Sequence, residues 1–261
     1  MNLKIKNKTV LISASTGGIG LATAMAFASE GATVIVNGRT STAVRIAINA
    51  IRNNYPDADL LELVADLGSK DGCDKAISEI PFVDILVNNI GIYEPVPFFE
   101  ETDEDWYRLI EINIMSGIRL SRHFLKQMLL KDTGRVIFIA SEVALNPDPA
   151  MAHYSATKAM QLSISRSLAE LTKGKQVTVN AVLPGPTATE GLVKFIQDIH
   201  ANLPRAEAEK KFISENRSSS LIQRLIQPNE IADTILFLSS PNAAAINGAI
   251  LKAEGGIVKG N

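Results

Sequence analysis

Residues 9–20 read TVLISASTGGIG, and this stretch decides the fold. It opens with apolar and β-branched residues typical of a strand, continues through small residues from Ser13 to Gly20, and leads into an alanine-rich helical pattern. Small residues let the backbone turn tightly and approach a pyrophosphate, which the free N–H groups at the helix N-terminus would bind. A glycine-rich turn alone is also an ordinary strand-to-helix connection. The strand before it and the helix after it are what favour a dinucleotide site.

Around this stretch, short β-branched runs alternate with longer helical patterns. We expect strands at residues 9–13, 33–36, 60–64, 84–87, 135–140, 177–183 and 249–252, and helices at 19–29, 42–53, 70–79, 103–130, 151–172 and 229–238. The alternation predicts parallel β-α-β units and an α/β fold, a doubly wound parallel sheet of the Rossmann type in three α/β/α layers. No linker divides the chain, so residues 1–261 are expected to form a single domain, with the polar stretch 187–227 as a small helical substrate lid.

The composition excludes several classes of protein. With 26 Lys and Arg against 28 Asp and Glu, the net charge of -2 argues against binding nucleic acid through broad basic charge. A hydrophobic share of 46% excludes disorder as the dominant state. The single cysteine allows no intrachain disulfide, and neither a membrane-spanning run nor a signal peptide is seen, so a cytoplasmic protein is expected. The isolated His123 and His200 lack metal-ligand spacing, so no metal is expected.

The end of the second expected strand indicates which dinucleotide is bound. An acidic residue there would hold the ribose hydroxyls of NAD, but the sequence at 37–40 is Asn-Gly-Arg-Thr. Gly38 leaves room and Arg39 can pair with a 2′-phosphate, which favours NADP(H), with NAD(H) as the second choice. The alternative is that Arg39 is a solvated loop arginine. Asp66, after the third strand, is either an acceptor for the adenine amino group or a helix cap.

A second group of residues follows the middle strands. Ser141 ends an apolar strand, where an open α/β sheet places its ligand crevice. Tyr154 and Lys158 lie four residues apart and share one face of the helix expected at 151–172. Such a pair alone is common on protein surfaces, and its position close after Ser141 makes it a candidate site.

Together these features resemble the short-chain dehydrogenase/reductase family. The ordered set covers essentially every element of the fold and consists of the turn at 13–20, Asp66, Asn88-Asn89-Ile90-Gly91, Asn113, Ser141, Tyr154-x-x-x-Lys158 and Pro184-Gly185. The resemblance implies that Tyr154 is the general acid or base and that Ser141 hydrogen-bonds the substrate oxygen. It also implies that Lys158 holds the nicotinamide ribose and lowers the tyrosine pKa from its ordinary value of about 10. Asn113 would hold a water that links Lys158 to solvent.

The resemblance also supplies a set of cofactor-binding residues. Thr187 and the backbone of 183–185 are expected to meet the nicotinamide carboxamide. The full set is Ser13, Ser15, Thr16, Gly18, Ile19, Gly20, Asn37, Arg39, Thr40, Asp66, Leu67, Asn89, Gly91, Tyr154, Lys158, Pro184, Gly185 and Thr187.

The sequence departs from the family pattern at four positions. Ala14 replaces the first glycine of the turn, which costs something like 1 kcal/mol or more if the position needs a positive φ. Ile90 stands where alanine is usual and Ala140 where serine is frequent. Glu142 is an unusual acid beside Ser141, open to a cationic or hydroxylated substrate, and we expect it to face solvent instead.

Several other side chains have two readings. His153, beside Tyr154, is expected to pack or lie exposed rather than relay protons. Tyr93, Phe98 and Phe99 follow Gly91, where they would line the mouth of a substrate pocket. Four apolar residues of the 187–227 stretch would close that pocket or form a satellite core of their own, namely Phe195, Ile196, Ile199 and Phe212.

The function expected from this resemblance is NADP(H)-dependent interconversion of a ketone and a small-molecule secondary alcohol. One alternative is a 3-oxoacyl-[acyl-carrier-protein] reductase, which needs a basic patch for its acidic partner; the candidates are Arg119, Arg122, Arg166, Lys210, Lys211 and Arg217, with Glu207, Glu209 and Glu215 among them. Another is a non-catalytic NADP(H)-binding sensor or scaffold. By resemblance, the chain is also expected to form a homodimer or homotetramer.

Overall fold

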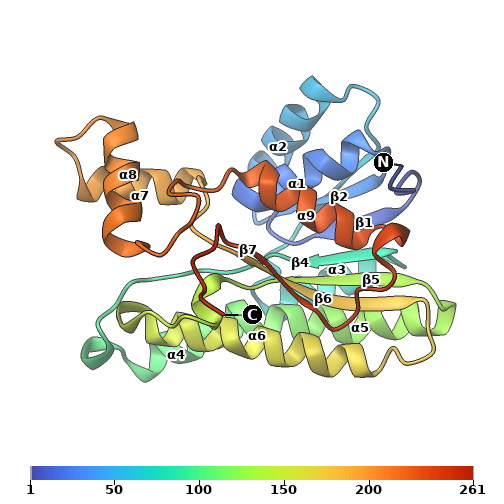
Figure 1. The fold of residues 1–261 in the computed structure, drawn as a ribbon. Coiled ribbons are helices and arrows are strands. Elements are labelled where there is room, and N and C mark those ends of the chain that lie inside the picture. The colour runs from blue at the N-terminus through green and yellow to red at the C-terminus, as the bar shows by residue number, and fades with distance from the viewer. Residues whose placement is uncertain (1, 261) are drawn as a thin grey trace.

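The computed structural model describes residues 2–260, which form one parallel sheet with helices on both faces (Figure 1). The seven strands have the order β3-β2-β1-β4-β5-β6-β7. They are β1 (Thr9–Ile12), β2 (Thr33–Gly38), β3 (Leu60–Val64), β4 (Ile85–Asn88), β5 (Gly134–Ile139), β6 (Val177–Pro184) and β7 (Ile250–Ala253). The helices are α1 (Gly18–Ser29), α2 (Ser41–Asn54), α3 (Lys70–Glu79), α4 (Asp103–Leu109), α5 (Ser116–Lys131), α6 (Ala152–Glu170), α7 (Glu190–Ile199), α8 (Arg205–Asn216) and α9 (Pro228–Ser239). The expected doubly wound α/β fold is confirmed.

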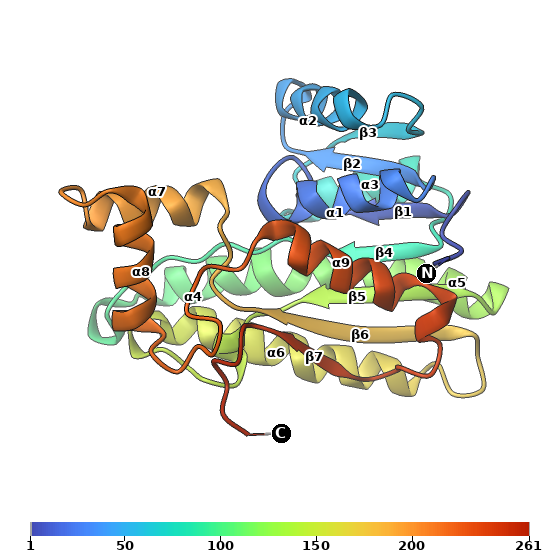
Figure 2. The same cartoon turned by 45° about the horizontal axis from the view of Figure 1, so that its top comes forward.

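Both faces of the sheet are covered (Figure 2). Successive strand residues point to opposite faces, so Val10 and Ile12 join the core under α1, α2 and α9, while Leu11 joins the core under α3, α5 and α6. This two-sided burial explains why the central strands are almost continuously apolar. β1 pairs with β2 on one side and β4 on the other, so the strand order reverses there and opens a crevice at the carboxyl ends.

The helical run expected at 103–130 is interrupted. α4 begins with a capping box between Thr102 and Asp105, a π-helical segment spans Ile110–Met115, and α5 continues to a left-handed Asp132. The prediction of one long helix had the right extent and missed this change of winding. Hydrophobic spacing does not reveal this change, which coincides with a contact to α6 described below.

The stretch 187–227 forms a helical insertion that contains α7 and α8 and projects beyond the carboxyl edge of the sheet (Figure 1). Ile196 and Phe212 pack with Ala208, Ile213 and Leu225 in a core of the insertion itself. The satellite-core reading is therefore correct for these two residues. Phe195 packs partly buried against the same core, and Ile199 is exposed.

Cys73 on α3 lies in the core beneath the sheet. Its side chain is fully buried and its thiol donates to the Leu67 carbonyl oxygen at 3.2 Å. Burial raises the pKa of the Cys73 thiol to about 11, so the neutral form dominates at physiological pH.

The described chain was also searched for membrane spans and metal clusters. No helix within residues 2–260 combines the length and apolarity needed to cross a membrane. Across the same residues, no group of three or more His, Cys, Asp or Glu side chains is arranged to hold a metal ion.

Candidate active site

The glycine-rich turn meets the start of α1 in an open arrangement. Gly17 caps the helix without a side-chain hydrogen bond, and a Cβ there would meet nothing within 4 Å. The first N–H groups of the helix are therefore available to an anion. Gly20 has the opposite constraint, because a Cβ would lie 2.3 Å from the Ala14 carbonyl oxygen. Gly18 adopts a φ of +54°, which favours glycine.

Ala14 also lies in the left-handed region, with a φ of 53°. Its N–H donates to Asn37 Oδ1 at 2.9 Å, and its carbonyl oxygen accepts from Asn89 Nδ2 at 3.2 Å. These contacts hold the strained backbone in place, so the turn keeps its shape without the usual glycine.

Asn37 and Ser15 belong to the frame beneath the turn. Asn37 Nδ2 donates to the carbonyl oxygens of Leu63 and Ala65 at 3.1 and 3.0 Å, and its N–H donates to Ser15 Oγ at 2.8 Å. Both side chains are buried. A direct contact of either residue with a cofactor stays a prediction, since the structure shows their side-chain polar groups joining β1, β2 and β3 to one another.

Ser13 and Asn89 join the turn to the loop after β4. Ser13 Oγ accepts from the N–H groups of Asn89 and Ile90 at 2.9 and 3.1 Å, and Asn89 Nδ2 donates to the Ser13 carbonyl oxygen at 2.9 Å. Asn89 therefore ties the loop after β4 to the glycine-rich turn. Ile90 packs partly buried against the core, in the place of the usual alanine.

The expected adenosine pocket has a cationic edge. Arg39 is exposed just after β2 and forms no ion pair within the described chain, and Thr40 Oγ1 caps α2 by accepting from Ala43 N. Asp66 is exposed and accepts from Gly68 N at 3.1 Å, so one of its oxygens takes part in a turn. Leu67 is buried in the core, which leaves only its backbone for a cofactor contact.

Lys158 is a buried member of the group that it forms with Ser141 and Tyr154. Its Nζ donates to the Ile139 carbonyl oxygen at 2.9 Å and to Gln161 Oε1 at 3.2 Å. A Cβ on Gly91 would be 3.0 Å from this Nζ, so glycine keeps the loop close to the ammonium. Burial lowers the pKa of Lys158 to about 7.

Tyr154 lies above Lys158, with its ring centroid 5.5 Å from Nζ. Burial and the charge of Glu142 raise the Tyr154 pKa above its ordinary value, and a hydrogen bond with Ser141 opposes them. The expectation that Lys158 would lower this pKa is therefore wrong in this structure. The reason is geometric, because the ammonium is itself buried and is directed at Ile139 and Gln161.

Asn113 occupies the π-helical segment and fastens the loop that carries Tyr93. Its Oδ1 accepts from Ile92 N at 2.8 Å, while Nδ2 donates to the Ile92 carbonyl oxygen at 3.0 Å and to Thr157 Oγ1 at 3.2 Å. The Asn113 carbonyl oxygen accepts from Gln161 Nε2 at 2.8 Å. Gln161 and Thr157 were missed from the sequence. The signal for Gln161 was its position three residues after Lys158 on the same helix.

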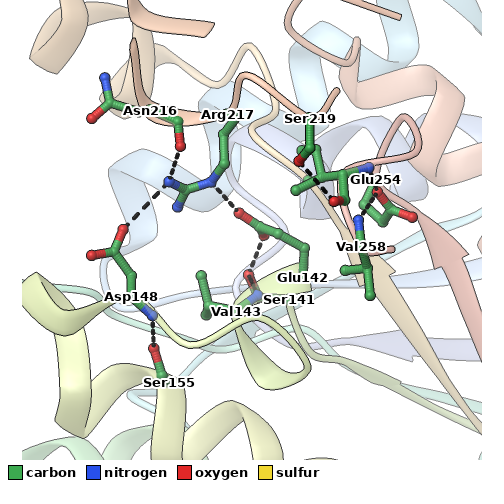
Figure 3. A network of polar contacts seen from close by, with 12 residues as sticks. Ser141, Glu142, Val143, Asp148, Ser155, Asn216, Arg217, Ser219, Glu254 and Val258 are labelled. Carbon is green, nitrogen blue, oxygen red and sulfur yellow. Dashed lines mark hydrogen bonds and ion pairs between the residues drawn. The ribbon is translucent and has the colours of Figure 1, made fainter. Parts of the chain in front are cut away.

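Glu142 was expected to face solvent, and this is wrong. Its side chain is 5% exposed and pairs with Arg217 Nε at 3.0 Å, while Ser141 Oγ donates to Glu142 Oε2 at 2.6 Å (Figure 3). The same guanidinium contacts Asp148 at 3.3 Å. No local pattern indicates this pairing, because Glu142 and Arg217 are 75 residues apart.

The end of β6 leads into the helical insertion beside the glycine turn. Pro184 and Gly185 are buried, and Thr187 Oγ1 donates to the Gly185 carbonyl oxygen at 2.9 Å. Thr189 Cγ2 would lie 3.0 Å from a Cβ on Gly18. Thr189, which was missed from the sequence, therefore brings the insertion against the glycine-rich turn.

The aromatic residues are distributed unevenly. The Tyr93 and Tyr154 ring centroids are 6.1 Å apart, so Tyr93 borders the site. Phe98 and Phe99 pack on each other and are exposed. His153 is fully buried, with Nδ1 2.7 Å from Glu101 Oε1, which confirms a packing role.

Comparisons with known proteins agree with this geometry. The sequence model of the short chain dehydrogenase family matches residues 8–199. The chain is 52% identical over 261 residues to the uncharacterized oxidoreductase YvaG of Bacillus subtilis (99% of each chain). It is 31% identical over 256 residues to the 3-oxoacyl-[acyl-carrier-protein] reductase FabG of Rickettsia typhi (96% and 97%).

Among solved structures, the L-sorbose reductase of Gluconobacter frateurii, complexed with NADPH and L-sorbose, superposes with a TM-score of 0.92 at 28% identity over all of both chains. The actinorhodin polyketide ketoreductase with NADPH gives a TM-score of 0.87 at 26% identity, covering 97% of this chain and 98% of that one. Two reductases with the same fold as this chain are therefore seen with NADPH bound. The chain belongs to the short-chain dehydrogenase family and is an NAD(P)-dependent oxidoreductase.

Proposed function

We propose that the protein uses NADP(H) to interconvert a small ketone and a secondary alcohol. The observation that carries this proposal is the meeting of Ser141, Tyr154, Lys158 and Asn113 at the carboxyl ends of β4 to β6, beside the glycine turn at the start of α1. A hydride donor bound along that edge would bring its reactive carbon to this group.

Each residue has a distinct role in the proposed reaction. The nicotinamide supplies or accepts the hydride when it is bound. In reduction, Tyr154 gives its phenolic proton to the substrate oxygen as the carbonyl becomes a hydroxyl, and Ser141 hydrogen-bonds that oxygen. Lys158 binds the nicotinamide ribose. Asn113 keeps the loop at 92 against α6 and holds the water through which Lys158 exchanges protons with solvent.

The preference for NADP(H) rests on Arg39. Arginine pairs well with phosphate, and the end of β2 carries no acid to hold ribose hydroxyls. We expect Arg39→Ala to weaken NADPH binding at least tenfold and to leave NADH binding nearly unchanged, measured by nicotinamide fluorescence titration. Arg52→Ala, in the last turn of α2, is the control and should alter neither affinity. Equal losses for both cofactors would contradict the assignment.

The substrate class we favour is a small polyhydroxylated ketone. The support is the likeness to an L-sorbose reductase whose solved structure holds NADPH and L-sorbose.

A 3-oxoacyl-[acyl-carrier-protein] substrate is the second candidate, supported by the sequence likeness to FabG. It is disfavoured because several basic residues that would meet an acidic carrier are paired with acids. The pairs are Arg119–Glu111, Arg166–Glu170, Lys211–Glu215 and Arg217–Glu142.

Turnover tests the proposal directly. NADPH oxidation is followed with L-sorbose, a simple ketone and an acetoacetyl thioester. We expect Tyr154→Phe to reduce turnover by at least a hundredfold with NADPH affinity nearly intact, because it removes only the transferable proton. Tyr107→Phe, at an exposed tyrosine of α4, is the matched control and should retain full turnover. Normal turnover by Tyr154→Phe would refute the mechanism, and tight NADPH binding without turnover on any carbonyl would favour the sensor alternative.

A further inference from the structure

Arg217 connects the helical insertion to the site. It follows the last residue of α8, and its guanidinium reaches across to the segment after β5 (Figure 3). Nε donates to Glu142 Oε1 at 3.0 Å, and NH1 donates to Asp148 Oδ2 at 3.3 Å and to the Asn216 carbonyl oxygen at 2.7 Å. The Arg217 side chain is only 13% exposed, so its charge faces these protein partners rather than solvent.

The two acids contact different parts of the site. Glu142 Oε2 accepts a hydrogen bond from Ser141 Oγ at 2.6 Å. The N–H of Asp148 donates to Oγ of Ser155, the next residue after Tyr154, at 3.3 Å. One guanidinium therefore anchors both the residue that directs Ser141 and the loop that packs on the start of α6.

The charge of Arg217 matters because Glu142 is buried. A buried carboxylate is costly unless an opposite charge accompanies it, and Glu142 obtains that charge from Arg217. An unbalanced Glu142 would repel the phenolate of Tyr154, because like charges disfavour ionisation. The other titratable groups facing Tyr154 are Lys158, 5.5 Å from its ring centroid, and Tyr93, and neither belongs to this network.

We propose that Arg217 is a positioning residue for the catalytic centre. It holds Glu142 in place and balances its charge, so that the position of the insertion governs the direction of the Ser141 hydroxyl and the charge that faces Tyr154. This inference rests on the proposed roles of Ser141 and Tyr154. Arg217 itself touches neither residue, and it acts through Glu142.

The test uses variants that change the charge at Glu142 in opposite senses. Glu142→Gln removes the repelling carboxylate, so the Tyr154 pKa falls; Arg217→Gln removes the counter-charge, so the Tyr154 pKa rises. The ultraviolet absorbance of the phenolate is followed against pH in the purified full chain. Each protein is paired with the same protein carrying Tyr154→Phe, so that the difference reports Tyr154 alone.

The expected order of the onset of ionisation is Glu142→Gln first, wild type second and Arg217→Gln last, with neighbouring steps of about one pH unit or more. The double variant, which lacks both charges, is expected to fall between the two single variants. Shifts of both single variants in the same direction, or no separation from wild type, would overturn the proposal.

Arg119→Gln is the matched control. It breaks another partly buried ion pair, in which Arg119 NH1 lies 2.6 Å from Glu111 Oε1, without contact to Ser141. It should lower stability and leave the Tyr154 titration unchanged. If Arg217→Gln does not fold, Arg217→Lys keeps a cation in reach and is expected to delay the onset by a smaller amount.

The titration requires no substrate, so its outcome is separate from that of the proposed function. Failure of every carbonyl substrate would refute the reductase proposal while the order of ionisation still decides the role of Arg217. A pH profile of alcohol oxidation, where turnover exists, is expected to shift in the same order.

Discussion

At the scale of single residues, the site is built from buried polar groups that bond to one another. Ser13, Asn37, Asn113 and Lys158 are each almost completely buried, and each makes several hydrogen bonds within the protein. Buried polar groups are costly unless they are satisfied in this way, so their geometry is rigid before any ligand binds.

Lys158 makes stability depend on pH. Its pKa is about 7 in the folded chain against an ordinary value of 10.5, so between these pH values the unfolded chain binds more protons and the free energy of unfolding rises with pH. Lys158→Met removes this dependence. We expect the variant's stability advantage over wild type to be greatest at and below pH 7 and to shrink toward pH 10.5, as measured by urea unfolding. Lys126→Met, at an exposed lysine of α5, is the control and should show a constant difference. A constant difference for Lys158→Met would contradict the prediction.

Ala14 offers a test of backbone strain. Because its φ is 53°, we expect Ala14→Gly to raise the free energy of unfolding by about 1 kcal/mol, measured by thermal or urea unfolding. Ala26→Gly, within α1, is the control and should lower it by about 1 kcal/mol, since helix interiors disfavour glycine. A loss at both positions would show that the turn is not strained.

At this scale, features set by local spacing could be predicted from the sequence, and long-range contacts could not. Ser141, Tyr154 and Lys158 were recognised because their spacing along one strand and one helix is local. Arg217 and Glu142 were not paired, because a contact between residues so distant in sequence depends on where the insertion settles. The pKa of Tyr154 was misjudged for the same reason, since it depends on that network and on the direction of Lys158.

At the scale of elements, the π-helical segment between α4 and α5 links the loop after β4 to α6. It turns Asn113 so that its side chain bonds Ile92 in the loop and its backbone carbonyl oxygen bonds Gln161 on α6. Such segments are frequent at functional sites because they free a carbonyl from the helical ladder. The hydrophobic pattern of 103–130 predicted helix throughout and gave no sign of the interruption, which accompanies this contact with α6.

Asn113→Ala is therefore expected to cost stability as well as turnover. The substitution leaves the Ile92 N–H and carbonyl groups without partners, which should lower the free energy of unfolding by about 2 kcal/mol. Asn54→Ala, at an exposed asparagine near the end of α2, should change it by about 0.5 kcal/mol or less. Unchanged stability for Asn113→Ala would mean that the loop is held by other contacts.

At the scale of the whole molecule, the order of strands and helices was readable from the sequence because each layer imposes its own periodicity. Continuous apolar runs marked strands covered on both faces, and amphipathic runs marked helices covered on one. The insertion of 187–227 was recognised as helical, but its own core and its contacts with Gly18 and Glu142 depend on packing that no periodicity encodes. Assembly into a dimer or tetramer stays a prediction.

The lone thiol of Cys73 gives this molecule a built-in reporter of opening. The sulfur lies under α3 with no exposed surface, and its high pKa keeps it protonated. A thiol reagent can reach it only in molecules in which α3 has separated from the sheet, and no second cysteine contributes background. The labelling rate in native buffer therefore reports how often α3 opens, and its change on adding NADPH would measure how far the cofactor stabilises α3 against opening.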